Sequence, residues 1–170
     1  HSFDTLQQIS QDILNQAKKS GASACEAEVS QGFGQNVTVR HNEVETIEYN
    51  RDKGLGVSVY FGQRRGHAST SDLSPEAIRD TVKAACSIAK HTASDEFAGL
   101  ADEALLAKEI PELDLYHPWE LPVEQAIALA QECEAAAMGV DKRINNSEGA
   151  SVSIHESLFV YANSLGFIGG

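Results

Sequence analysis

Histidine and glutamate stand side by side at His155 and Glu156, a pair that opens the HExxH motif of zinc hydrolases. In that motif, two histidines four residues apart share one face of a helix and bind zinc, while the glutamate acts as a base. Here Phe159 occupies the position of the second histidine, and the segment alternates like a strand. We therefore interpret the pair as solvated strand residues, and we predict no metal ligand and no catalytic residue in this chain.

Two further side chains, Cys86 and His67, could in principle support covalent or acid–base hydrolysis. Cys86 lies on the apolar stripe of an expected helix, where inert buried thiols are commoner than nucleophiles. His67 has no neighbour with a readable catalytic role, and helix capping explains the hydroxyl-rich run Ser69–Asp72. An independent hydrolase that uses Cys86 or His67 is therefore a weaker functional hypothesis than the two considered at the end of this section.

Glycine pairs occur at Gly32-Phe33-Gly34 and at Gly54-Leu55-Gly56. Each could begin a GxGxxG phosphate-binding loop, but Val37 and Val59 stand where the third glycine is needed. We interpret them as turn and strand glycines.

Four basic residues, Arg51, Lys53, Arg64 and Arg65, lie near adjacent expected hairpins of an otherwise acidic chain. A solvated face is the simpler interpretation. The sharper alternative is that they contact a peptide or a protein partner, in particular an acidic one.

Composition excludes several classes of function. The 170 residues include 13 Lys plus Arg against 25 Asp plus Glu, and the net charge of -12 disfavours direct binding to nucleic acid. No apolar run approaches the ~20 residues that a membrane span requires, and no leader pattern precedes the first expected helix. The sequence begins at His1 rather than Met, which is compatible either with a leader that has been removed or with a trimmed end. Three widely spaced cysteines, Cys25, Cys86 and Cys133, occupy apolar positions of the expected elements, which favours reduced thiols buried in the core of a cytoplasmic protein.

The first half of the chain shows the periods of two helices and an antiparallel strand meander. The strands should be separated at Gly32–Gly34, His41-Asn42, Arg51–Gly54 and Gly62-Gln63, where glycine or asparagine favours a turn. Arg64–Ser71 reads as a weak edge strand. Apolar spacing predicts helices from Phe3 to Lys19 and from Ser74-Pro75-Glu76 onward, and these should cover the apolar face of the sheet.

The second half predicts a long surface connection followed by a helix and a hairpin. Within residues 92–121, Ala101–Lys108 could form a short helix; Pro122–Met138 regains helical spacing, and Ile144–Ile154 pairs with Leu158–Ala162. The expected fold is α+β, with the meander and its helices as two layers. We expect one domain over residues 1–170, made of 1–91, a connection over 92–121 and a helix-plus-hairpin unit over 122–170, ending before a C-terminal domain.

Five runs in this order resemble the N-terminal region of the PmbA/TldD family, whose members are also described as peptide-maturation proteins and modulators of DNA gyrase. The run that begins at Arg40 and the run that begins at Asn50 each contain an expected turn. The run that begins at Asn50 and the run that begins at Ala68 are more similar to PmbA (TldE) than to TldD. The runs are Gly21-Ala22, Arg40-His41-Asn42-Glu43-Val44-Glu45, Asn50-Arg51-Asp52-Lys53-Gly54-Leu55-Gly56-Val57, Ala68-Ser69-Thr70-Ser71-Asp72-Leu73-Ser74 and Asn163-Ser164-Leu165-Gly166-Phe167.

This resemblance implies a cytoplasmic heterodimeric metallopeptidase that cleaves unfolded peptides and matures peptide precursors. It places zinc and catalysis in a TldD-like partner, through a HExxxH helix, and no cofactor in this chain. The alternative is a non-catalytic binding module that regulates a toxin/antitoxin or DNA gyrase system. By this resemblance the chain is a subunit of a metallopeptidase complex, and no catalytic residue is expected in this segment.

Overall fold

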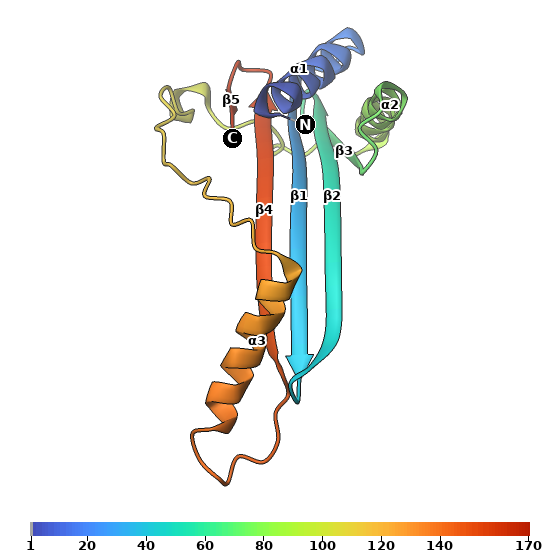
Figure 1. The fold of residues 1–170 in the computed structure, drawn as a ribbon. Helices are drawn as coiled ribbons and strands as arrows, with labels where there is room; N and C mark the ends of the chain where they lie inside the picture. The colour runs from blue at the N-terminus through green and yellow to red at the C-terminus, as the bar shows by residue number, and fades with distance from the viewer. Residues whose placement is uncertain (1) are drawn as a thin grey trace. The chain divides into compact units, whose positions relative to one another are not determined.

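The structure is a computed structural model that describes residues 2–170. Five strands form one sheet in the order β3-β2-β1-β4-β5 (Figure 1). None of the helices in residues 2–170 has both the length and the apolar character that a bilayer crossing needs. In chain order, the elements are α1 (Phe3–Lys19), β1 (Ala24–Arg40), β2 (Glu43–Phe61), β3 (Arg64–Thr70), α2 (Pro75–His91), the short 3-10 helix η1 (Glu103–Leu105), α3 (Val123–Met138), β4 (Ala150–Asn163) and β5 (Ile168–Gly169).

The chain forms two compact units, and each unit is made of segments that are not contiguous in the sequence. The first unit contains the described chain up to Gln31, together with Asp52–Glu112 and Ser157–Gly170. The second contains Gly32–Arg51 and Leu113–Glu156. Each of the three long strands β1, β2 and β4 therefore contributes one segment to each unit.

The long strands correct two predicted turns. Gly32–Gly34 lies inside β1 and Arg51–Gly54 inside β2, so neither segment turns the chain. The reason is visible at Gly34, where a side chain would occupy the place of the Asn50 carboxamide on the neighbouring strand. The glycine makes room for a side chain across the sheet and needs no turn conformation there.

Two predicted hairpin turns are confirmed. His41 and Asn42 have positive φ angles of 52° and 64°, the left-handed conformation that a two-residue hairpin loop requires. Gly62 has a φ of 62°, and the antiparallel register pairs Phe61 with Arg64 directly across its turn. The predicted edge strand is also confirmed as β3, which lies at one edge of the sheet and pairs with β2.

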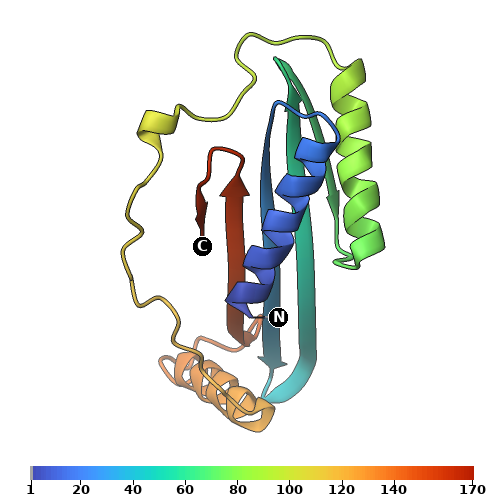
Figure 2. The ribbon, with the colours of Figure 1, turned by 90° about the horizontal axis from the view of Figure 1, so that it is seen from above.

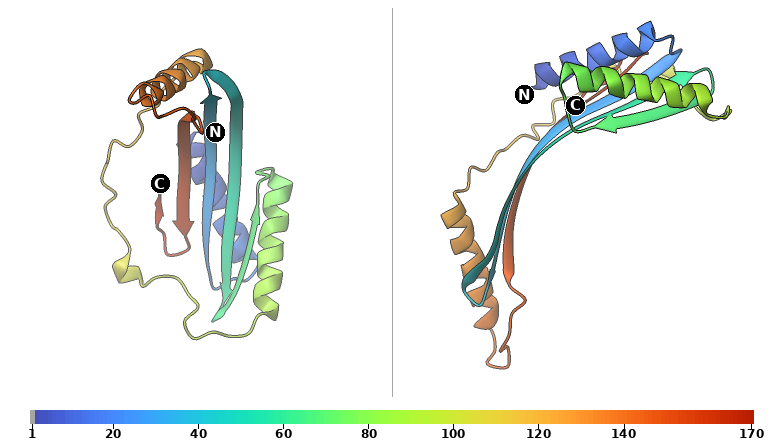
Figure 3. Two further views of the ribbon diagram at one scale, coloured as in Figure 1. Left: turned by 90° about the horizontal axis from the view of Figure 1, so that it is seen from below. Right: turned by 90° about the vertical axis from the view of Figure 1, so that its right-hand side faces the viewer.

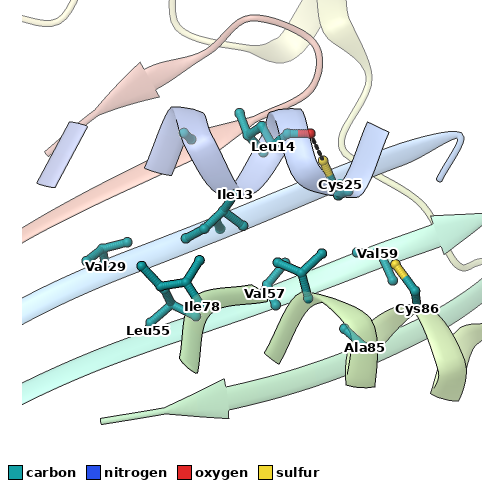
Figure 4. Packing of buried hydrophobic residues seen from close by; sticks show 14 of the residues in the cluster. Ile13, Leu14, Cys25, Val29, Leu55, Val57, Val59, Ile78, Ala85 and Cys86 are labelled. Carbon is teal, nitrogen blue, oxygen red and sulfur yellow. Dashed lines mark hydrogen bonds between the residues drawn. The ribbon is translucent and has the colours of Figure 1, made fainter. Parts of the chain in front are cut away.

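In the first unit, α1 and α2 lie on the same side of the strands (Figures 2 and 3). The predicted start of α2 is confirmed, because the Ser74 hydroxyl accepts the Ala77 N–H at 3.3 Å and Pro75 opens the helix. Figure 4 shows side chains of both helices, including Ile13 and Ile78, packed against Val57 and other β-branched residues of the sheet. A side chain at Gly66 would overlap the Ala85 carbonyl, so β3 and α2 approach backbone to backbone.

The cysteines follow the prediction only in part. Cys25 and Cys86 are buried, whereas Cys133 is exposed, so its expected burial is wrong. The buried stripe of α3 runs through Ala126, Ala130 and Glu134, and Cys133 lies on the flank of that stripe. Burial raises the pKa of the Cys25 thiol to about 11 and also raises the pKa of Cys86.

In the second unit, α3 is confirmed almost at its predicted bounds, but the predicted hairpin of Ile144–Ile154 with Leu158–Ala162 is wrong. Residues from both halves belong to the single strand β4. Ser151 lies beside Thr38 of β1 at 2.9 Å between hydroxyl oxygens, and two residues on Ser153 donates to Asn36 at 2.7 Å. Pairing with β1 thus keeps β4 extended where the local sequence alone favours a turn.

The turn after β4 comes at residues 164–167, before β5. The side chain of Asn163 accepts the backbone N–H groups of Leu165 and Phe167 at 3.1 and 3.3 Å, and Gly166 has a φ of 97°. The connection over residues 92–121 is largely irregular and exposed, and the helix expected over Ala101–Lys108 is reduced to η1.

Candidate functional site: a polar groove on the sheet of the first unit

A groove of about 710 Å³ lies on the sheet of the first unit. Strand alternation creates it: Cys25 and Val29 point into the apolar core, so Glu26, Glu28 and Ser30 point to the opposite side. Figure 3 (left) shows the strands in front of α1, on the side that the helix does not cover. We define the polar groove by its lining residues, Glu26, Ala27, Glu28, Ser30, Gly54, Leu55, Gly56, Ser58, His67, Ser69, Thr70, Ser71 and Tyr161.

Glu26 is held in place by two tyrosines. The Tyr60 hydroxyl donates to Oε1 at 2.9 Å, and the Tyr161 hydroxyl donates to Oε2 at 2.8 Å. Burial, reinforced by the hydrogen bond to Glu26, raises the pKa of Tyr60 to about 12. Burial likewise raises the pKa of Tyr161, and the bond to Glu26 acts in the same direction. Both hydroxyls therefore remain donors at neutral pH and orient the carboxylate.

Ser58 and His67 form a second polar contact, across the pair of β2 with β3. Ser58 Oγ lies 3.1 Å from His67 Nδ1, and Arg65 Nη2 donates to the same Oγ at 3.0 Å. The Ser58 oxygen accepts from Arg65 and retains a hydrogen and a second lone pair, so it can hold the His67 ring through Nδ1 in either tautomer. Ser58 is only 5 % exposed, so the contact positions His67 and does not present a nucleophile.

Two glycines form the floor of the polar groove. A Cβ at Gly56 would lie 3.4 Å from the His67 ring, and one at Gly54 would lie 3.2 Å from Ser30 Oγ. Any larger residue would raise its side chain into the space between the strands that carry Glu28 and Ser69. The Gly-Leu-Gly run thus shapes the floor of the polar groove, which differs from the predicted turn at Gly54 and from the phosphate loop considered beside it.

The structure separates the four basic candidates. Arg65 reaches Ser58 at the β3 side of the polar groove, whereas its neighbour Arg64 donates from Nη1 to the Lys90 carbonyl at 3.3 Å. Lys53 is an exposed residue of β2 in the first unit. Arg51 belongs to the second unit, where its guanidinium lies 5.8 Å from the centroid of the Phe33 ring. Arg64 and Arg65 are adjacent in β3, and they make different contacts.

Sequence reasoning passed over most of the polar groove. The alternation of Glu26, Glu28 and Ser30 with apolar residues was the available signal, since it already places them on one face. His67 and Ser69 carry the same signal on β3. This alternation does not reveal which strands are neighbours in the sheet. The residues of β1, β2, β3 and β4 line one groove only because these strands lie side by side.

The other sites weighed from sequence have simpler roles. His155 and Glu156 lie in β4 as expected, and Glu156 accepts a hydrogen bond from the Tyr116 hydroxyl at 3.4 Å. Cys86 is buried with a raised pKa, the opposite of what an activated thiol needs. Within residues 2–170, no group of three or more His, Cys, Asp or Glu side chains is placed to hold a metal ion.

Two family models match the chain. One, described as PmbA/TldA metallopeptidase domain 1, covers residues 25–89, and the other, the PmbA/TldA metallopeptidase central domain, covers residues 116–170. Among curated proteins, the chain is 45% identical to a metalloprotease PmbA homolog of Haemophilus influenzae, over 96% of this chain and 36% of that protein. It is 46% identical to metalloprotease PmbA of Escherichia coli O157:H7, over 92% of this chain and 34% of that protein.

Two solved structures with PmbA/TldD-type descriptions have a similar fold. A modulator of DNA gyrase from Bacteroides thetaiotaomicron matches with a TM-score of 0.86 at 25% identity, over 96% of this chain and 37% of that one. TldE from Thermococcus kodakarensis shows the same fold, with a TM-score of 0.65 at 15% identity, over 94% of this chain and 36% of that one. The chain spans about a third of the length of the curated relatives that it matches. By its two matched domains and its PmbA relatives, the chain belongs to the PmbA/TldD family as a PmbA (TldE)-like member.

Proposed function

We propose that the chain is the N-terminal region of a PmbA (TldE)-like subunit of a cytoplasmic, heterodimeric zinc metallopeptidase. The complex cleaves unfolded peptides and matures peptide precursors, while zinc and catalysis reside in a TldD-like partner. The observation that carries this proposal is the 45% identity over 96% of the chain to a protein described as a metalloprotease PmbA homolog. Zinc in the partner would supply polarisation of the scissile carbonyl and activation of water.

Within this complex, we assign the first unit a role in receiving peptide. β3 lies at one edge of the sheet, so a peptide in an extended conformation can add to its outer edge by main-chain hydrogen bonds. Arg64 and Arg65 begin that strand, and the polar groove reaches it through His67 and Ser69. The edge and the polar groove together offer a peptide both backbone and side-chain contacts.

The complex is tested by co-purification of the full-length protein with a TldD-like subunit. Peptide hydrolysis should require both proteins and should be lost on zinc chelation. Hydrolysis by this protein without a partner would overturn the division of roles.

The β3 edge is tested separately with Arg64→Glu and Arg65→Glu in the assembled complex. Both changes should slow peptide cleavage, with Arg79→Glu on the exposed face of α2 as the charge-matched control. Arg64→Glu is the more specific variant, because Arg64 contacts the carbonyl of the exposed Lys90, whereas Arg65 contacts the buried Ser58. A cleavage rate unchanged by Arg64→Glu and Arg65→Glu would refute this peptide site.

A second candidate function is a binding module that regulates a toxin/antitoxin or DNA gyrase system. The observation in its favour is the Bacteroides thetaiotaomicron neighbour described as a modulator of DNA gyrase, with its TM-score of 0.86. The same reconstitution separates the two functions, because a regulator would bind its target without any peptide hydrolysis by the reconstituted pair.

A further inference from the structure

We propose that the polar groove binds the side chain of a lysine or arginine in the peptide substrate. This inference rests on the proposed peptidase function, and it adds a preference for peptide sequence to it. Among the described residues that line the polar groove, the acidic side chains are Glu26 and Glu28, while the cation Arg65 lies at the β3 side, 3.0 Å from the Ser58 hydroxyl oxygen. A cationic side chain therefore complements the charge of the side that carries Glu26 and Glu28, and an acidic side chain would be repelled from that side.

The negative charge lies at one side of the polar groove. Glu26 and Glu28 are on β1, and β2 lies between them and the β3 residues His67 and Ser69. Neighbouring strands are about 4.8 Å apart, so the carboxylate side and the β3 side are separated by roughly 10 Å. An extended lysine or arginine can have its backbone near β3 and its charged end near β1.

The carboxylate side is organised before any ligand arrives. Each oxygen of Glu26 accepts one tyrosine hydroxyl, at 2.9 Å from Tyr60 and 2.8 Å from Tyr161. A carboxylate has about four acceptor positions, so it retains the capacity to accept from an ammonium or a guanidinium group. Because Glu26 is already held in one orientation, little side-chain entropy is lost when the cation binds.

The opposite side offers contacts for the peptide backbone. His67 Nδ1 faces Ser58, which leaves Nε2 for a polar contact on the same side of the sheet as Gly56. Ser69 of β3 and Ser71, which follows the last residue of that strand, line the polar groove on the same side. The glycine floor keeps the space between the two sides open to a side chain laid across it.

Glu28→Gln is the variant that tests this inference most cleanly. Glu28 is exposed, and the change removes one charge while leaving the tyrosine bonds to Glu26 in place. Glu96→Gln, in the exposed connection, removes the same charge away from the lining and is the matched control. The ligands are two fluorescent peptides that differ only in lysine against norleucine at one central position.

The experiment uses the full-length protein in complex with its partner and measures peptide binding and cleavage separately. Binding should favour the lysine peptide, and Glu28→Gln should reduce that preference about two- to five-fold, the range expected for one exposed ion pair. Glu96→Gln should leave the preference unchanged, and added salt should weaken it.

Equal binding of the two peptides, or a lysine preference that Glu28→Gln does not alter, would overturn the inference. If the unmodified complex cleaves neither peptide but binds the lysine peptide with a preference that Glu28→Gln reduces, the proposed peptidase function is contradicted and the groove assignment is supported.

Discussion

Glu134 of α3 accepts the backbone N–H of Asn42 at 2.7 Å through one carboxylate oxygen, and its other oxygen accepts the N–H of His41 at 2.8 Å. Both donors belong to the two-residue turn between β1 and β2, whose positive φ angles direct these N–H groups away from the strand ladder. Gln131, one helical turn earlier, donates to the Asn42 carbonyl at 2.8 Å. A helix more than 80 residues distant in the chain thus stabilises the hairpin turn within the second unit.

Glu134→Gln should destabilise the second unit. The amide keeps one oxygen for one of the two N–H groups, but its NH2 group then faces the other N–H, donor against donor. We expect the thermal midpoint to fall by a few degrees, while Glu132→Gln, an exposed glutamate on the same helix, should leave it unchanged. Hydrogen exchange at His41 and Asn42 localises the effect, and unchanged protection there would contradict the capping role.

The same carboxylate should make stability depend on acidity. Hydrogen bonding from Asn42, with further bonds from Ser147 and His41, lowers the pKa of Glu134 below its ordinary value of 4.5. A lowered folded-state pKa stabilises the protein above the unfolded pKa, and this contribution is lost as pH falls through the lower folded value. Denaturation curves between pH 7 and pH 3 should show this acid loss in the unmodified protein and a smaller one in Glu134→Gln.

Gly66→Ala should disrupt the first unit. The added methyl group would overlap the Ala85 carbonyl and approach Ala89, both backbone positions of α2 that cannot move away alone. Overpacking of this kind costs about 1–3 kcal/mol or more. Gly99→Ala is the control, since nothing lies within 4 Å of a Cβ at that position. Equal denaturation midpoints for the two variants would show that β3 and α2 can separate without loss.

Tyr60 predicts a loss of stability at alkaline pH. Its pKa is raised from 10.0 to about 12, so between these values the unfolded chain releases a proton that the folded protein retains. Stability is therefore complete below about pH 10 and decreases as pH rises toward 12. Tyr60→Phe should show a shallower decrease over this interval, and Tyr49→Phe, at an exposed tyrosine, should follow the unmodified protein. Parallel curves for all three would exclude this titration.

The three cysteines should differ in reactivity toward a thiol reagent at pH 8. Cys133 is exposed, whereas Cys25 and Cys86 are buried with raised pKa values that keep little thiolate present. We expect one thiol to react rapidly in the native protein and all three after denaturation, with Cys133→Ser removing the rapid phase. Rapid modification of Cys86 would show that α2 opens readily from the sheet.

Helices and turns could be predicted from the sequence because the signals that specify them are local. The apolar period and the Ser74-Pro75 start specify α2, and His41-Asn42 and Gly62 occupy positions where positive φ is required. The same local reasoning misplaced the strand breaks at Gly32–Gly34 and Arg51–Gly54. A glycine that leaves room for Asn50 across the sheet has the same local sequence signature as a glycine that turns the chain.

By itself, the sequence determined which residues share a face of each strand, where α1, α2 and α3 begin, and the family to which the motifs belong. Only the tertiary structure decided that Glu26 lies between Tyr60 and Tyr161, and that Ser58 lies beside His67. The physical reason is that the two-residue period of a strand orients its side chains but carries no information about which strands become neighbours. That choice depends on the burial of the whole apolar face beneath α1 and α2, and the polar groove on the other face is its consequence.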